Sequence, residues 1–143
     1  MATRIAFTRM VIGSDHGGLD MKEMLKKHVE SRIGSIKDVG CYTADRCDYP
    51  DIAKEVYNES ARGDDSATTL SVYVCGSGNG INMSANKAMA AGDHQSTGCC
   101  LLHDVTTARY ARDKRNTKAI ALGGRVTGTD VAKEILDVFV PPV

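Results

Sequence analysis

Short apolar runs alternate with segments of helical spacing along this chain. The first half predicts a strand over Met10–Gly13, with a start nearer Ile5 as the alternative, and a second short strand over Ile36–Val39. A helix that ends near Gly34 is expected between them. Its buried face is marked by four apolar residues at four-residue spacing: Met21, Leu25, Val29 and Ile33.

The second half continues the alternation after a polar loop over Cys41–Pro50. The expected elements are a helix over Asp51–Arg62, a strand that ends at Cys75, a helix after Gly80, a strand over Gly98–Leu102, a helix over Val105–Arg115, a strand over Ala119–Leu122 and a helix over Asp130–Phe139. Strands that alternate with helices form a parallel sheet covered on both faces. The 143 residues therefore predict one domain, residues 1–143, with a three-layer α/β/α, Rossmann-like fold and a five-stranded parallel sheet.

Charge and hydropathy exclude several classes of function. The 18 basic and 18 acidic side chains balance, so no overall field attracts nucleic acid or an anionic membrane. No apolar run approaches the roughly 20 residues that span a bilayer, and the start of the chain lacks the apolar core of a signal peptide. Five cysteines without framework spacing predict reduced thiols in a cytoplasmic protein.

The closest approach to a metal-binding pattern is the trio Cys99, Cys100 and His103. The chain has no CxxC pair, and neighbouring cysteines on a strand point to opposite faces. We therefore expect no metal site, and nothing in the sequence calls for a cofactor.

The strongest candidate for chemistry is the loop that follows the third strand. It consists of Cys75, Gly76, Ser77, Gly78, Asn79 and Gly80. Glycines between a strand end and a helix start let several backbone N–H groups point at one anion, either a phosphate or a developing oxyanion. A cysteine at the mouth of such a nest can act as a nucleophile or, once ionised, as a base. The alternative is a simple turn with a buried thiol.

Two further glycine turns end predicted strands and carry polar side chains. Asp15 and His16 precede Gly17-Gly18, and Arg125 follows Gly123-Gly124. Histidine and arginine suit a phosphate, and aspartate suits a sugar hydroxyl or a ring oxygen. Asp15 as a simple helix cap and Arg125 as a surface residue are the alternatives. Because ligands bind beyond the carboxyl ends of parallel strands, the three turns are expected to meet at one crevice.

Five motifs along the chain also occur together, and in this order, in one known family. They are Gly13–Gly18, Asp48–Asp51, Cys75–Gly80, Asn86-Lys87 and Leu122–Gly128. Over almost its whole length the chain resembles the ribose-5-phosphate isomerase B / galactose-6-phosphate isomerase family. The resemblance implies metal-free aldose–ketose isomerisation of a phosphorylated sugar. It also implies a homodimer or a dimer of dimers with active sites at the subunit interface.

The same resemblance implies a role for each matching residue. In the Cys75–Gly80 loop, the cysteine resembles the base that moves a proton between C1 and C2 of the sugar. The backbone N–H groups of that loop resemble the hole for the enediolate oxygen, and Ser77 stands where the family usually has threonine. Asp15 resembles the residue near the ring oxygen, while His16 and Arg125 resemble phosphate ligands.

The sequence also departs from the family pattern. The family's ring-opening histidine and the asparagine after it fall on Lys114 and Arg115, which makes Lys114, or His103, the candidate for ring opening. A short insertion lies within Ala88–Thr97, and Gly98 replaces an arginine. The chain reaches Val143 without the segment that often sends two arginines into the neighbouring subunit's phosphate site.

These departures leave the substrate open. Ribose 5-phosphate and ribulose 5-phosphate are favoured. The alternatives are a four- or six-carbon sugar phosphate such as galactose 6-phosphate, a role as one subunit of a mixed enzyme, and a non-catalytic sugar-phosphate binding module.

Overall fold

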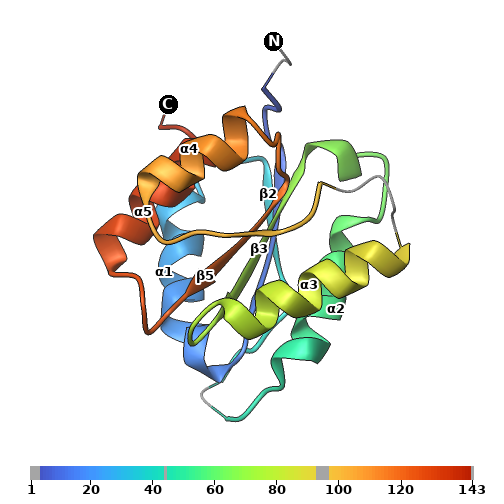
Figure 1. Ribbon diagram of the computed structural model, residues 1–143, viewed down its shortest axis with the longest axis vertical. Coiled ribbons are helices and arrows are strands. Elements are labelled where there is room, and N and C mark those ends of the chain that lie inside the picture. Colours follow the sequence, from blue (N-terminus) through green and yellow to red (C-terminus); the bar gives the residue numbers. More distant parts are fainter. Residues whose placement is uncertain (1–3, 44, 93–96, 143) are drawn as a thin grey trace.

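The computed structural model describes residues 4–43, 45–92 and 97–142, which form one parallel sheet with helices on both faces (Figure 1). The strands are β1 (Arg9–Ser14), β2 (Ser35–Asp38), β3 (Thr69–Cys75), β4 (Cys100–Leu101) and β5 (Ala119–Gly123). The helices are α1 (Leu19–Val29), α2 (Tyr49–Ser60), α3 (Asn79–Gly92), α4 (Val105–Asp113) and α5 (Thr129–Phe139), with short 3₁₀ turns η1 (His16–Gly18) and η2 (Ser66–Thr68). The predicted fold class is confirmed.

The strand order is β2-β1-β3-β5-β4, and every pairing is parallel. From β1 the chain goes outward to β2, then returns to β3 and continues toward the other edge of the sheet. The direction of winding therefore reverses between β1 and β3. In sheets of this kind the crevice for a ligand opens at that reversal, beyond the carboxyl ends of the strands.

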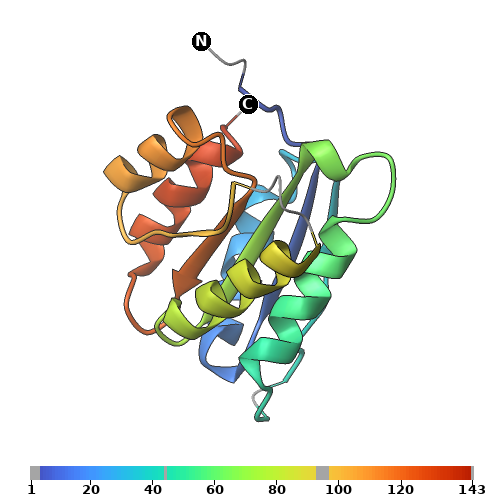
Figure 2. The same ribbon diagram turned by 45° about the vertical axis from the view of Figure 1, so that its right-hand side comes forward.

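The core has two layers, one on each face of the sheet. Helices α1, α4 and α5 cover one face, and α2 and α3 pack side by side on the other (Figures 1 and 2). The side chains of β3 alternate between the two layers. Val72 and Val74 pack in the first, and Tyr73 and Cys75 pack in the second. Both faces are buried, which is why the strands appear as continuous apolar runs in the sequence.

Several element boundaries differ from the prediction. Helix α1 ends at Val29 instead of near Gly34, because the chain must turn back to reach β2, and Ile33 packs against the core from that turn. The alternative start of β1 near Ile5 is wrong, since the strand begins at Arg9.

Two other elements are shorter than predicted, and one is shifted. Strand β4 is reduced to Cys100–Leu101 and α4 ends at Asp113, two residues before Arg115. Helix α2 starts at Tyr49, with proline in its first turn, where the missing N–H costs no hydrogen bond. The inserted segment continues α3 as far as Gly92, and residues 93–96 lie outside the described residues.

The prediction of five reduced thiols is wrong for two of them. Cys41 and Cys47 form a disulfide, with their Cα atoms 6.4 Å apart. Both lie in the polar loop before α2, and a cysteine count cannot reveal such a pairing. Cys99 packs in the layer of α2 and α3, whereas Cys100 packs against the opposite layer, so the predicted opposite orientation of these neighbours is confirmed.

Two kinds of feature are absent from residues 4–43, 45–92 and 97–142. No helix there has the length and apolar character needed to cross a membrane. No three His, Cys, Asp or Glu side chains there are grouped so that they could hold a metal ion.

Candidate active site

The three glycine turns predicted to converge do meet, at the carboxyl ends of β1, β3 and β5. A Cβ atom on Gly17 would lie 3.1 Å from the backbone nitrogen of Gly76, and one on Gly124 would lie 2.7 Å from the carbonyl oxygen of Gly17. A Cβ on Gly124 would overlap the Gly17 backbone and one on Gly17 would crowd Gly76, so glycine permits the turns to approach this closely. Residues from distant parts of the sequence thereby form one crevice.

The loop after β3 forms the predicted amide nest around a cysteine. The Sγ atom of Cys75 accepts a hydrogen bond from the Gly78 N–H at 3.1 Å, and the side chain is almost fully buried. Gly78 has φ +84°, a left-handed conformation that favours glycine. The Asn79 N–H donates to Ser77 Oγ at 3.1 Å where α3 begins. The thiol and the N–H groups at the start of α3 therefore share one site.

The turn after β5 is bonded to this loop. The Gly124 N–H donates to the Cys75 carbonyl at 2.8 Å, and the Arg125 N–H donates to the Gly76 carbonyl at 2.9 Å. The Arg125 side chain is exposed, yet its Nη1 atom lies only 3.5 Å from where a Cβ of Gly76 would be. The guanidinium therefore lies beside the nest, where an anion would meet it.

The turn after β1 supplies a carboxylate and an imidazole. Asp15 Oδ1 accepts the Gly17 N–H at 2.9 Å and thereby caps the 3₁₀ turn η1. A capping carboxylate keeps further lone pairs that can accept a ligand hydroxyl. His16 is exposed at the first position of η1, directly before the glycine that touches Gly76.

Tyr49, for which the sequence indicated no role, lies at the far end of the nest. A Cβ on Gly80 would lie 2.7 Å from the Cζ atom of the Tyr49 ring. The ring belongs to the first residue of α2 and is 40% exposed. It forms a wall at the Gly80 end, and the only signal for it was its place in the Asp48–Asp51 motif.

Asn86, in another of the motifs, has a structural role. Its side-chain amide donates to the Cys99 carbonyl at 3.1 Å, and its Oδ1 accepts the Cys99 N–H at 2.8 Å. These bonds fix the start of β4 against α3. The neighbouring Gly98 has φ +88°, so a residue with a side chain would be strained there.

The candidates for ring opening are not brought to the crevice of their own chain. Helix α4 runs antiparallel to the strands (Figure 1). Lys114 and Arg115 follow its last residue and are exposed, so they lie at the opposite end of the sheet from Cys75. His103 follows β4 at the carboxyl end of the sheet, but β4 is an edge strand and this side chain is also exposed.

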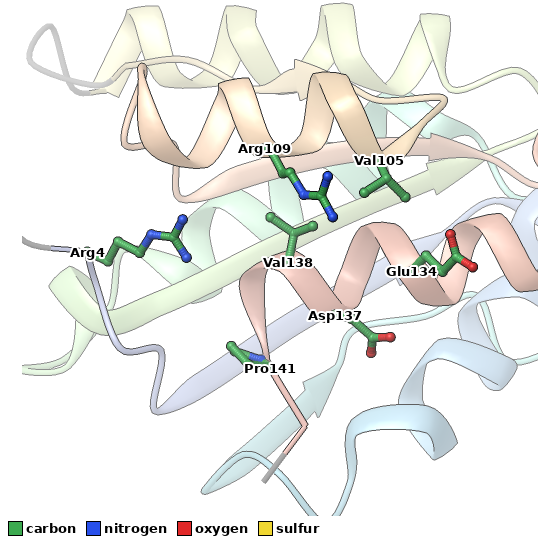
Figure 3. A pocket seen from close by; sticks show the side chains of 7 residues that line it. All are labelled: Arg4, Val105, Arg109, Glu134, Asp137, Val138 and Pro141. Atoms are coloured by element: carbon green, nitrogen blue, oxygen red, sulfur yellow. The ribbon is translucent and has the colours of Figure 1, made fainter.

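Two hollows of the chain lie away from the glycine turns. One, of about 420 Å³, separates α4 from α5 beside Arg4, and its lining mixes arginines with carboxylates (Figure 3). The other, of about 680 Å³, opens at the amino ends of β3 and β5 next to Thr69 and Ala119. Neither hollow is lined by Cys75 or by the nest, so the candidate active site does not coincide with either of these cavities.

Comparisons with known proteins agree with this geometry. The galactose-6-phosphate isomerase subunit LacB of Clostridium acetobutylicum is 37% identical over 128 residues, which cover 90% of this chain and 69% of that protein. D-erythrulose-4-phosphate isomerase 2 of Mycolicibacterium smegmatis is 30% identical over 131 residues, covering 90% and 80% of the two chains. The solved structure of ribose-5-phosphate isomerase B from Clostridium thermocellum matches with a TM-score of 0.81 and 28% identity, covering 93% and 84%.

The family model described as Ribose/Galactose Isomerase matches residues 10–142, which include all three turns of the crevice. The resemblance drawn from the five motifs is thereby confirmed. This chain belongs to the ribose/galactose isomerase family of sugar-phosphate isomerases.

Proposed function

We propose that this enzyme interconverts ribose 5-phosphate and ribulose 5-phosphate, with Cys75 as the base. The observation that supports this most is the position of the Cys75 sulfur, which lies against the backbone N–H of Gly78 at the start of α3. An enediolate route needs one base close to a group of donors for an oxyanion, and this loop supplies both.

In the proposed reaction the Cys75 thiolate removes the proton from C2 of the open-chain aldose. The C–H electron pair forms the C1–C2 double bond, and the former carbonyl oxygen takes the negative charge against the N–H groups of the nest. The C2 hydroxyl proton passes to the oxygen on C1, and the thiol returns its proton to C1. The product is the ketose, and no electrons enter or leave, so the reaction needs no cofactor.

The remaining groups of the crevice bind the substrate in this proposal. His16 and Arg125 hold the phosphate, because both turns lie against the nest. The turn of His16 packs against Gly76, and the turn of Arg125 is hydrogen-bonded to Gly76 and Cys75. Asp15 accepts a hydrogen bond from the sugar near its ring oxygen. Gly76 and Gly80 supply backbone N–H groups to the substrate, while the Gly78 N–H holds Cys75 Sγ and the Asn79 N–H holds Ser77 Oγ.

We further propose a homodimer, or a dimer of dimers, in which the crevice lies between subunits. Arg115 lies at the far end of its own sheet, so a second copy is the way to bring its guanidinium to a crevice. On α3, Met83 is 61% exposed, which suits a helix that packs against a partner. Light scattering at micromolar concentration is expected to show the dimer, whereas a fully active monomer would refute the shared site.

The experiment that tests the substrate is turnover of a panel of four-, five- and six-carbon aldose and ketose phosphates. We expect the highest kcat/KM for ribose 5-phosphate and ribulose 5-phosphate. A preference for galactose 6-phosphate would favour the activity named for the LacB relative. A preference for a four-carbon substrate would favour the activity named for the erythrulose-4-phosphate isomerase relative. Turnover that appears only with a second protein would indicate a mixed enzyme. Phosphate binding without any turnover would indicate a non-catalytic module.

We place the enzyme in the cytoplasm, where phosphorylated sugars are metabolised. The Cys41–Cys47 disulfide would there face thiol reductants, which keep most cytosolic cysteines reduced. Alkylation of free thiols immediately on cell lysis, followed by mass spectrometry, tests this location. In the cytoplasm these reductants are expected to open the disulfide, so that Cys41 and Cys47 are both modified, whereas a fully oxidised pair would argue for an oxidising compartment.

A further inference from the structure

A lysine is fully buried directly behind the first turn of the crevice. The Lys22 side chain, on the first turn of α1, has no exposed surface. Its Nζ atom donates to both carboxylate oxygens of Asp38, at 2.9 and 2.7 Å, and to the carbonyl oxygen of Cys41 at 2.5 Å. A buried ammonium group is costly unless its donors are satisfied, and here all three N–H bonds have an acceptor.

The same carboxylate and ammonium hold the short segment Gly40-Cys41 from both sides. Asp38 Oδ1 accepts the Gly40 N–H at 2.9 Å, while Lys22 bonds the Cys41 carbonyl. The Tyr42 hydroxyl donates to the Asp38 carbonyl at 2.9 Å, and its ring lies 5.2 Å from the Lys22 ammonium. The backbone at the end of β2 is thus fixed by a buried ion pair.

This segment in turn fixes the residue that precedes Asp15. The Ser14 N–H donates to the Gly40 carbonyl at 2.7 Å, and the Ser14 carbonyl accepts the Cys41 N–H at 2.6 Å. On the other flank the Asp15 N–H donates to the Val74 carbonyl at 3.1 Å. The turn that carries Asp15 and His16 is therefore held between the Gly40-Cys41 segment and β3.

We propose that Lys22 and Asp38 are positioning residues for the reaction, which set Asp15 and His16 against the Cys75 loop through Gly40-Cys41 and Ser14. This inference rests on the proposed function for the roles of Asp15 and His16. Lys22 touches no substrate. Its loss frees the Cys41 carbonyl and Asp38, the Gly40-Cys41 segment relaxes, and the first turn moves relative to the nest.

The charge state of the cluster supports this arrangement. Burial opposes ionisation of Asp38, but the hydrogen bonds from Lys22 and Lys26 and from the Gly40 N–H outweigh it and lower the pKa of this carboxyl. Asp38 therefore stays ionised at neutral pH, so it can accept the hydrogen bonds from Lys22 and from the Gly40 N–H.

The chain offers a matched control. Lys26 also bonds Asp38, at 2.8 Å to Oδ2, but it is partly exposed, and it donates to Asp38 and Glu23 and not to the Cys41 carbonyl. Lys22→Met removes the ammonium with little change of shape, and Lys26→Met removes an equal charge from the same carboxylate. With the best substrate of the panel, we expect Lys22→Met to lower kcat/KM about 10- to 100-fold and to weaken inhibition by inorganic phosphate. Lys26→Met should change neither.

Amide hydrogen exchange separates positioning from general loss of stability. In Lys22→Met the amides of Ser14 and Cys41 should exchange faster, while those of Gly78 and Gly124, in the other two turns, keep their wild-type rates. Uniformly faster exchange, or wild-type kcat/KM and phosphate inhibition in folded Lys22→Met, would overturn the proposal. If Lys22→Met does not fold, Asp38→Asn is used instead. It should show the same fall in kcat/KM and the same local increase in exchange, and wild-type kinetics or uniformly faster exchange would overturn the proposal.

The experiment also distinguishes a failure of the proposed function from a failure of this inference. A wild-type protein that turns over none of the sugar phosphates would contradict the proposed function. The exchange rates and phosphate binding of Lys22→Met and Lys26→Met would still support or overturn the positioning of the first turn.

Discussion

The two ends of the parallel sheet use polar groups in different ways. At the amino end, side chains bond to one another and to nearby backbone. Arg9 Nη1 pairs with Asp65 at 3.1 Å, Thr8 and Thr68 join through their hydroxyls at 2.6 Å, and Thr117 donates to the Gly98 carbonyl at 3.1 Å. At the carboxyl end, close-packed glycine turns present backbone N–H groups around a thiol.

The difference shows which end can do chemistry. Polar side chains that satisfy one another contribute to stability and leave little to bind a ligand. Glycine turns expose donors without side chains in the way, and helix α3 begins among them. The Lys22–Asp38 cluster combines the two. Its side chains bond to one another and to nearby backbone, as at the amino end, but they support a glycine turn of the carboxyl end.

The sharpest test of this comparison is Cys75→Ala. We expect turnover to fall about 10²- to 10⁴-fold, with substrate binding largely kept, because the lost group acts only in proton transfer. Arg9→Ala, at the amino end, is the control and should lower thermal stability without lowering kcat. Turnover close to wild type in Cys75→Ala would make this cysteine only a packed thiol.

The next largest effect is expected at the phosphate. Arg125→Ala should raise KM about 10- to 100-fold, since it removes a charged hydrogen bond, and displacement of the substrate should lower kcat less. Arg115→Ala removes the same side chain from the opposite end of the sheet. With the crevice shared between subunits, we expect Arg115→Ala to raise KM as well, whereas an unchanged KM would show that a second copy does not supply this residue.

A smaller effect is expected for ring opening. Lys114 is exposed at the amino end of the sheet, away from the crevice of its own chain, so we expect ring opening to be poorly catalysed. Turnover should favour a sugar phosphate that cannot cyclise over one that forms a furanose, and Lys114→Ala should leave both rates unchanged. Fast turnover of the cyclic substrate that depends on Lys114, or on His103, would contradict this.

The smallest effect concerns acid stability. Burial raises the pKa of Asp38 and of Asp137, but bonds from Lys22 and Lys26 to the first, and from Arg32 and His28 to the second, lower both below the ordinary value. A depressed folded-state pKa contributes stability above the unfolded pKa, near pH 4, and this is lost as pH falls through the folded value.

Urea unfolding between pH 6 and pH 2 measures this loss. Asp38→Asn and Asp137→Asn should both lower the free energy of unfolding at pH 6 and flatten its decline toward pH 2. Only Asp38→Asn, beside the crevice, should also lower kcat/KM. Equal kinetic effects of the two variants would mean that stability alone explains the role of Asp38.

Much of this architecture was predictable from the sequence, because it depends on local patterns. Alternating apolar runs and helical spacing predicted the strands, the helices and their parallel arrangement. The glycines around Cys75 predicted an anion nest, since few other residues permit so tight a turn. Boundaries were less predictable, as Ile33 shows, because an apolar residue packs equally well from a helix or from the turn that follows it.

Other features depend on contacts between distant residues and were decided by the tertiary structure. Lys22 has the sequence context of a solvent-exposed lysine, and only the position of β2 beside β1 buries it against Asp38. The Cys41–Cys47 pairing and the contact of Tyr49 with Gly80 depend likewise on the path of a loop. Lys114 aligns with a site residue in sequence but lies at the far end of the sheet, because the direction of α4 is set by packing.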